Sequence, residues 1–178
     1  MYNEKVAKNE KHQTQLLKLK QFMQNWVDNT SNDKKHLITI SGDTGVGKTY
    51  LTECTATYAL KKGYLVSLLS SFGMNNLFLK YISSKNEEKT TTFDSLMDPE
   101  LLIIDDLGAE PIIKNVTIEY LYLIISERLS ANKSTIITTN LGPEIIRDRY
   151  GERIFSRLFN KKESFNALII GNDLRINK

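Results

Sequence analysis

Short apolar runs alternate with helix-like stretches along this chain. Five of these runs have the length of a strand and are rich in Leu, Ile, Val and Thr, a composition typical of strands. Near-continuous apolar strands that alternate with helices indicate a parallel sheet covered by helices on both faces. We therefore predict an α/β fold. The expected strands occupy residues 37–40, 64–69, 101–104, 134–139 and 167–170.

Apolar residues spaced three or four positions apart predict the helices. The clearest helix covers residues 115–129, where Ile118, Leu121 and Ile125 recur at helical spacing. The other expected helices cover residues 16–27, 49–62 and 74–82, with one or two short helices within 147–159.

The same pattern indicates a single domain. The chain has 178 residues, close to the usual size of one domain, and shows neither an internal repeat nor a Pro-rich or Ser-rich linker. Residues 1–13 are polar and are expected to fray, and residues 83–92 are expected to form a polar loop. We expect an N-terminal helix and linker over residues 1–35, followed by the main domain over residues 36–178.

Composition narrows the class of protein. Hydrophobic residues make up 40% and charged residues 25% of the chain, which is typical of globular proteins. The single cysteine, Cys54, excludes an internal disulfide and a Cys-rich zinc site, and His12 and His36 lack partners at metal-ligand spacing. No apolar run reaches the ~18 residues of a membrane span, and no secretory signal is recognisable. We expect a cytoplasmic protein without a membrane partner.

One motif points to nucleotide binding. It matches the pattern G-x-x-x-x-G-K-[ST] and lies between an expected strand and an expected helix, the context that a phosphate-binding loop requires. Backbone N–H groups of such a loop cradle phosphate oxygens, the lysine reaches the terminal phosphates, and the final hydroxyl holds Mg²⁺. The following helix adds its positive dipole end. The motif consists of Gly42, Asp43, Thr44, Gly45, Val46, Gly47, Lys48 and Thr49.

Polar residues at the ends of two other expected strands add the remaining chemistry. Asp105 follows an apolar strand and is expected to bind Mg²⁺ through its water shell, while Asp106 is expected to orient or deprotonate the attacking water. Asn140 follows the strand over residues 134–139, and its amide would face the γ-phosphate and the water. These residues predict a site that binds a nucleoside triphosphate and activates water.

The arginines are unevenly distributed. All six lie in the last third of the chain, although the net charge is only +3. Arg149, Arg153 and Arg157 recur every four residues, and we expect them to share one helical face. Glu152 could partly neutralise Arg149, whereas Arg157 has no carboxylate three or four residues before it. The row is expected to keep excess positive charge, which favours an anionic partner.

Four segments, read in order, resemble a known family. GDTGVGKT, LLIIDDLGAE, IITTN and YGERIFSRL are similar to motifs of the DnaC/DnaI-type helicase-loader ATPases of bacterial replication. These are AAA+ proteins of the initiator group, and the IstB-type transposition helpers are close relatives. The resemblance runs from about Leu37 to Arg175. It implies a P-loop NTPase fold of AAA+ type, with a parallel five-stranded sheet flanked by helices and a small or absent C-terminal lid.

The resemblance also implies the nucleotide-binding residues and cofactors. Residues 42–49 correspond to Walker A, and Asp105 and Asp106 correspond to Walker B. The implied cofactors are ATP or ADP and Mg²⁺. Most AAA+ proteins have Glu where this chain has Asp106, and the shorter side chain can still position water.

Further roles concern the arginines and Asn140. By resemblance, Asn140 corresponds to sensor 1 and Arg175 to sensor 2, which contacts the nucleotide of its own subunit. Arg157 corresponds to an arginine finger supplied to the neighbouring subunit, with Arg153 at the same boundary. A finger supplied in this way is worth roughly 10³–10⁵ in rate in GTPases. The expected activity is thus an ATPase that depends on assembly and is slow in isolation.

The resemblance implies partners as well. The expected function is to help load a replicative DnaB-type helicase onto single-stranded DNA, with self-association through the arginine-finger face. Family members usually carry an N-terminal helicase-binding domain, for which the residues before the first strand are too few. Candidate DNA contacts, where initiator-type proteins carry an extra helix, are Lys80, Tyr81, Lys85 and Lys89.

Two alternatives remain open. A transposition-helper ATPase would share the same core and differ in its client, which the core sequence separates poorly. A small-molecule P-loop phosphotransferase would share the phosphate loop and an Arg-rich lid resembling residues 147–157, but the chain shows no obvious acceptor-binding insertion. The phosphotransferase is the weaker alternative.

Overall fold

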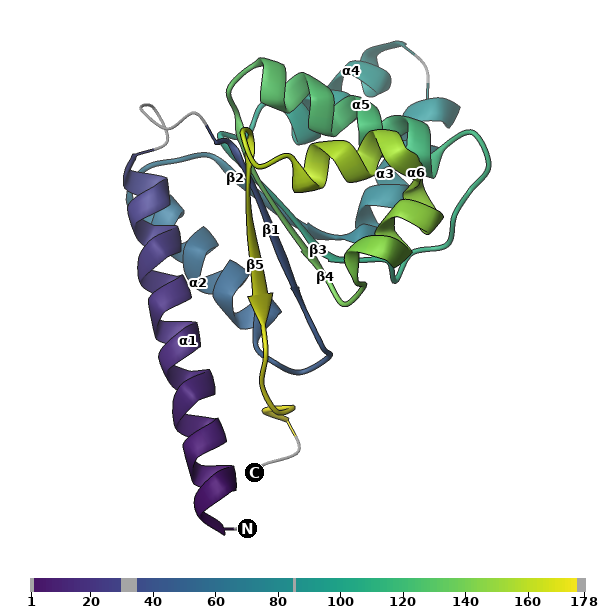
Figure 1. The fold of residues 1–178 in the computed structure, drawn as a ribbon. Helices are drawn as coiled ribbons and strands as arrows, with labels where there is room; N and C mark the ends of the chain where they lie inside the picture. Colours follow the sequence, from purple (N-terminus) through teal and green to yellow (C-terminus); the bar gives the residue numbers. More distant parts are fainter. Residues whose placement is uncertain (1, 30–34, 85, 176–178) are drawn as a thin grey trace.

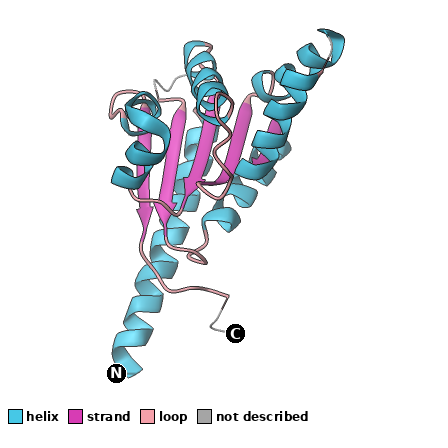
Figure 2. Cartoon of the chain, turned by 90° about the vertical axis from the view of Figure 1, so that its right-hand side faces the viewer, coloured by secondary structure: helices cyan, strands magenta, loops and turns pink. Residues whose placement is uncertain are grey.

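Five parallel strands form the centre of the computed structural model, which describes residues 2–29, 35–84 and 86–175. The strands are β1 (Leu37–Gly42), β2 (Val66–Ser70), β3 (Leu101–Leu107), β4 (Ser134–Thr139) and β5 (Ser164–Ile169). They lie in the order β2-β3-β4-β1-β5, and each neighbouring pair is parallel (Figure 2). All five expected strands are confirmed, with most of their ends displaced by a few residues.

Helices cover both faces of this sheet (Figure 1). They are α1 (Tyr2–Asp28), α2 (Lys48–Lys61), α3 (Ser71–Ser83), α4 (Asn86–Met97), α5 (Thr117–Ser130) and α6 (Pro143–Phe159). Successive strand residues point to opposite faces. Ile103 therefore packs with α1 and α2, whereas Leu102 and Ile104 pack with the helices α3 to α6. The two layers confirm the α/β prediction, and none of the helices in the described ranges is long and apolar enough to cross a membrane.

Two expectations about local structure are wrong. Residues 83–92 were expected to form a loop, but most of them belong to α4, which continues to Met97. Its last turn buries Leu96 in the core, and this tertiary contact outweighs the low helix propensity of the threonines before it. Residues 2–13, expected to fray, belong to α1, where His12 is buried against the rest of the chain.

The strand order gathers the candidate site residues at one edge of the sheet. β1 lies between β4 and β5, and β4 also borders β3. Because all strands are parallel, the loops that follow β1, β3 and β4 leave from the same edge. This edge carries residues 42–49, Asp105 and Asp106 near the end of β3, and Asn140 after β4.

Candidate functional site

The loop between β1 and α2 has the backbone that phosphate binding requires. Gly45 and Gly47 adopt φ values of 81° and 103°, which are strained for residues with a side chain. A Cβ on Gly45 would lie 2.0 Å from an oxygen of Asp173, so this position also lacks space. Val46 between them is 1% exposed and anchors the loop in the core. The loop can therefore present its N–H groups to an anion.

Lys48 begins α2 and is buried beneath this loop. Its Nζ donates hydrogen bonds to the carbonyl oxygens of Gly42 at 2.6 Å and Asp43 at 2.8 Å. Burial lowers the pKa of Lys48, and the carboxylates of Asp106 and Asp105 partly offset this effect. The ammonium group thus lies at the base of the loop, close to the carboxylates of Asp106 and Asp105.

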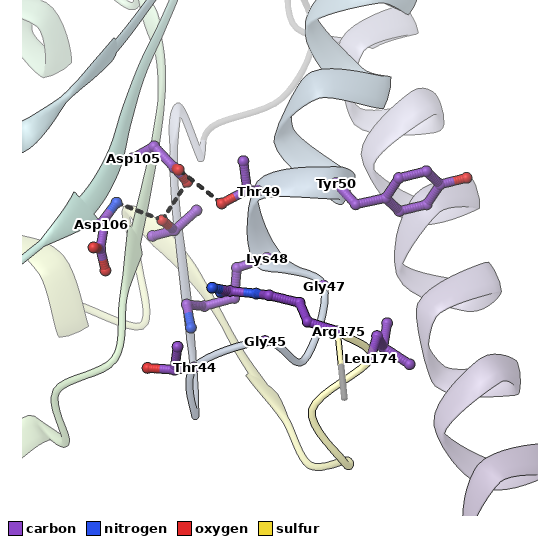
Figure 3. A pocket seen from close by; sticks show the side chains of 11 residues that line it. Thr44, Gly45, Gly47, Lys48, Thr49, Tyr50, Asp105, Asp106, Leu174 and Arg175 are labelled. Atoms are coloured by element: carbon purple, nitrogen blue, oxygen red, sulfur yellow. Dashed lines mark hydrogen bonds between the residues drawn. The ribbon is translucent and has the colours of Figure 1, made fainter. Parts of the chain in front are cut away.

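Thr49 and Asp105 form the oxygen-rich side of the site (Figure 3). Thr49 Oγ1 donates to Asp105 Oδ2 at 2.8 Å, and Thr138 Oγ1 donates to Asp105 Oδ1 at 2.7 Å. Hydroxyl and carboxylate oxygens are the ligands that Mg²⁺ prefers. Thr49 and Asp105 therefore fit a magnesium site as donors.

Thr138 is a site residue that sequence reasoning missed. Ile104 pairs with Ile137 and Leu107 with Thr139, so two residues of β3 lie opposite the single residue Thr138. This is a β-bulge, a feature common next to active sites. Thr138 is fully buried, and besides binding Asp105 it accepts a hydrogen bond from the Asp106 N–H at 2.8 Å. The strand carries four hydroxyl residues among its six, so its composition does not single out Thr138.

The bulge explains the unusual backbone of Asp106. Asp106 has φ of 59°, a left-handed conformation that is uncommon for residues other than glycine, although Asp and Asn adopt it more readily than most. Thr138 holds its N–H, and Ser71 Oγ donates to its carbonyl oxygen at 2.8 Å. Strain of this kind persists where surrounding contacts over-determine it, often at functional sites. The Asp106 carboxylate is thereby directed into the cavity.

A cavity of about 360 Å³ joins these groups (Figure 3). The tail after β5 closes one side, where Leu174 N–H donates to Gly45 O at 3.0 Å. Arg175 lies in the cavity and extends toward Lys48. The cavity thus collects residues predicted from three separate segments. Its lining comprises Thr44, Gly45, Gly47, Lys48, Thr49, Tyr50, Asp105, Asp106, Thr138, Leu174 and Arg175.

The N-terminal helix also contacts the phosphate loop. His12 Nε2 donates to the Val46 carbonyl at 2.9 Å, and a Cβ on Gly47 would lie 3.3 Å from Leu16. His12 is 2% exposed and packs against Gly171 of the tail. Nothing in the sequence pattern indicated this contact, because it joins segments far apart in the chain.

Apart from the loop residues Gly42, Asp43 and Val46, three predicted site residues do not line the cavity. Among the described residues, Asn140, Arg153 and Arg157 do not line it. Asn140 is exposed directly after β4. The Arg153 guanidinium lies 4.3 Å from the centre of the Tyr122 ring. Hydrogen bonding by Arg157, and to a lesser extent by Arg153, lowers the pKa of Tyr122, so both arginines converge on this phenol.

The predicted arginine face is wrong. α6 bends at Gly151, where φ is 82° and ψ is 167°, so Arg149 precedes the bend and Arg153 and Arg157 follow it. The side chain of Arg149 reaches the backbone carbonyl of Glu110 instead. The expectation of one or two short helices within 147–159 is confirmed as two helical segments meeting at this bend.

The predicted charge balance of this region is also wrong. Glu152 pairs with Arg147 at 3.1 Å and not with Arg149. Arg157 lies 3.6 Å from the carboxylate of Glu163, which follows it in the chain. Spacing along a regular helix could not reveal these pairs, because the bend and the turn before β5 bring the partners together.

The candidate DNA contacts differ in their settings. Lys80 is exposed on α3, whereas the Tyr81 ring packs against Phe93 and Tyr120 with centroids 5.7 Å and 5.5 Å away. Lys85 and the side chain of Lys89 lie outside the described residues.

The chain is similar to a protein family and to a curated relative. A family model described as IstB-like ATP binding protein matches residues 4–156. The chain is 29% identical over 119 residues to the uncharacterized protein YdaV of Escherichia coli (strain K12). That match covers 66% of this chain and 47% of YdaV, so the aligned region spans about half the length of this curated relative.

Several solved structures have a similar fold. The DnaC helicase loader matches with a TM-score of 0.68 and 24% identity, covering 82% of this chain and 86% of that one. DnaI matches with a TM-score of 0.68 and 23% identity, covering 88% and 82%. AMPPCP-bound DnaA from Aquifex aeolicus matches with a TM-score of 0.66 and 21% identity, covering 84% and 44%. These likenesses confirm the predicted P-loop fold of AAA+ type.

Proposed function

The chain belongs to the IstB-like ATP-binding protein family, and from this membership we propose that it is an ATPase whose active site is completed by a neighbouring copy and which helps load a ring helicase onto single-stranded DNA. One observation carries the proposal. Lys48, Thr49, Asp105 and Asp106 line one cavity, while Arg153 and Arg157 lie outside it. Lys48 and Arg175 supply positive charge to the cavity from the same subunit, and a second copy would add the arginine pair that lies outside it.

The phosphate loop binds and orients the triphosphate. Backbone N–H groups of residues 44–48 and the N-terminus of α2 attract the phosphates. Lys48 exchanges its bonds to the Gly42 and Asp43 carbonyls for phosphate oxygens. This exchange favours the bound state, because a buried ammonium group gains an anionic partner.

Thr49 and Asp105 would hold Mg²⁺, and Thr138 keeps Asp105 in place for this task. When bound there, Mg²⁺ neutralises charge on the β- and γ-phosphates.

Asp106 acts on the attacking water. Its carboxylate accepts a proton as the water oxygen bonds to the γ-phosphorus and the bond to the β–γ bridging oxygen breaks, which yields ADP and phosphate. Asn140, exposed beside it at the same sheet edge, orients the water and the γ-phosphate.

Arginines stabilise the charge that develops during this step. Arg175 serves the nucleotide of its own subunit, since it lies in the cavity beside Lys48. Arg157 and Arg153 serve the neighbouring subunit, which makes the α6 face the surface of self-association.

Two client proteins are compatible with this ATPase chemistry. The fold likeness to a helicase loader and to DnaI supports a replicative DnaB-type helicase as the client, with single-stranded DNA as the strand onto which the helicase is loaded. The IstB-like family match favours a second candidate, a transposase as client. Both candidates use the same ATPase chemistry.

ATP turnover per subunit, measured against protein concentration with and without single-stranded DNA, tests the proposal. We expect turnover to rise with concentration in the wild type and to remain low in Arg157→Ala, which should still bind ATP. Lys161→Ala, which removes an exposed cation nearby, is the matched control. Turnover that is independent of concentration and unchanged in Arg157→Ala would contradict a shared site. Pull-down with a DnaB-type helicase or with a transposase then separates the two clients.

A further inference from the structure

Glu110 is a fully buried carboxylate in the loop that follows β3. One carboxylate oxygen, Oε2, accepts the Gly108 N–H at 2.8 Å, and Oε1 accepts the hydroxyl of Tyr150. Its backbone carbonyl accepts the side chain of Arg149. A buried carboxylate is costly unless such bonds satisfy it. The hydrolysis chemistry makes no use of this group, so its burial calls for another role.

Two more contacts join the same segments. Thr139 Oγ1 donates to Leu107 O at 2.6 Å. Gly108 has φ of 111°, and a Cβ there would lie 2.5 Å from Leu141. The segment that follows Asp106 is therefore held against Thr139 and Leu141 before α6 and against Tyr150 within α6.

The first half of α6 connects this loop to the arginine pair. Tyr150 is 1% exposed, and both burial and the bond to Glu110 raise its pKa, so the hydroxyl remains a donor. Gly151 follows, with φ of 82° and open space around a Cβ. Its conformation, and not crowding, requires glycine here. The segment beyond this bend carries Arg153 and Arg157.

We propose that Glu110 is a positioning residue that couples the nucleotide site of each subunit to the arginine pair that the same subunit offers to its neighbour. The coupling rests on the proposed function, since it assigns Arg153 and Arg157 to the neighbouring site. A nucleotide that moves Asp105 and Asp106 moves Glu110 with them. The hydrogen bond between Tyr150 and Glu110 transmits this displacement to the first half of α6. The bend at Gly151 then changes the orientation of the segment that carries the two arginines.

Tyr150→Phe is the sharpest variant, because it removes only the hydroxyl that binds Glu110. Glu110→Gln is the second variant and keeps the size of the side chain. Tyr64→Phe is the matched control, since it removes a hydroxyl that donates to Val27 O at 3.3 Å beside α1. Thermal unfolding identifies any variant that fails to fold.

Hydrogen exchange of the peptide over residues 143–159 tests the coupling in the lone chain, with AMPPCP as the probe. We expect AMPPCP to slow exchange about fivefold or more in the wild type and in Tyr64→Phe. In Tyr150→Phe and Glu110→Gln the slowing should vanish, although AMPPCP affinity changes by less than about twofold. The proposal would be overturned if AMPPCP did not slow exchange in the wild-type peptide, or if it slowed exchange in the Tyr150→Phe peptide as much as in the wild type.

Mixing of variants tests the consequence for the neighbour. Asp106→Asn chains should bind ATP and supply arginines without hydrolysing, while Arg157→Ala chains should hydrolyse only with arginines from another copy. Their mixture should recover turnover, and adding Tyr150→Phe to the Asp106→Asn chain should reduce this recovery about fivefold or more. Equal recovery would overturn the coupling. Failure of the first mixture would refute the shared site alone, because the exchange measurement judges the coupling independently.

Discussion

Thr138 Oγ1 donates a hydrogen bond to Asp105 Oδ1 at 2.7 Å and accepts one from the Asp106 N–H at 2.8 Å. A single hydroxyl on β4 thus sets the orientation of the Asp105 carboxylate and the backbone of Asp106. Since the β-bulge places two residues of β3 opposite Thr138, both contacts depend on the pairing of β3 with β4.

Thr138→Val should therefore impair hydrolysis more than nucleotide binding. The substitution preserves shape and removes the buried hydroxyl, which releases Asp105 and leaves a buried N–H unsatisfied. We expect turnover to fall about 10- to 100-fold and the free energy of unfolding to fall by about 1–3 kcal/mol. Steady-state hydrolysis, ATP titration and denaturant unfolding measure the three effects. Thr138→Ser retains the hydroxyl and should restore turnover; equal turnover in Val and Ser variants would contradict this role.

Gly45→Ala should weaken ATP binding, because a Cβ at this position displaces the Asp173 carboxylate, which accepts a hydrogen bond from the Arg175 N–H at 2.8 Å. Gly63→Ala is the matched control, since Gly63 has a similar φ of 89° and open space around a Cβ. Both variants should lose about 1–2 kcal/mol of unfolding free energy from backbone strain. Only Gly45→Ala should lower ATP affinity, by about tenfold. Equal affinities in the two variants, measured by titration calorimetry, would refute the assigned contact.

The parts of the site that could be predicted from sequence are local in the chain. Residues 42–49 are contiguous, and their glycines and lysine carry the chemistry without reference to distant partners. Asp105 could be assigned because it ends an apolar strand that must join the same sheet. Thr138 could not, because its role depends on a two-against-one register between strands that sequence spacing does not encode.

The prediction that the three arginines share one helical face is wrong for a related reason. Equal spacing of Arg149, Arg153 and Arg157 predicts one face only if the helix is regular, and Gly151 interrupts it with a left-handed backbone. The glycine within the row was a readable sign of a break. The fold itself was more predictable than these contacts, because five apolar runs separated by helices admit few arrangements.

Arg128→Met should destabilise the fold without changing the site. Arg128 is fully buried, and its guanidinium donates to the carbonyls of Leu96 and Pro99 at 2.9 Å and of Ser134 at 2.6 Å. Removal of the donors leaves these carbonyls unsatisfied, and each such group costs about 1–3 kcal/mol, so we expect the unfolding free energy to fall by about 3 kcal/mol or more. The exposed Lys161→Met should change it by less than about 0.5 kcal/mol.

ATP affinity of the Arg128→Met chains that remain folded should match the wild type. The Lys161→Met control also removes a positive charge but breaks no buried hydrogen bond, so it separates the effect of the lost bonds from the effect of the lost charge. An Arg128→Met protein as stable as Lys161→Met would show that the buried bonds contribute little.

ATP affinity should fall at alkaline pH because of Lys48. Burial lowers the pKa of Lys48 below its ordinary value of 10.5, and bound phosphates favour the charged ammonium, so the pKa in the complex is higher than in the free chain. Below the pKa of the free chain, Lys48 is charged in both states and affinity is constant. Between the two pKa values, binding takes up a proton, and affinity falls by up to about tenfold per pH unit as the pH rises. The decline should therefore begin below pH 10.5. Calorimetric titration of ATP across this range measures it, and Lys48→Arg, whose charge persists to about pH 12, should bind more weakly without the decline; parallel pH profiles of wild type and Lys48→Arg would exclude Lys48 as the titrating group.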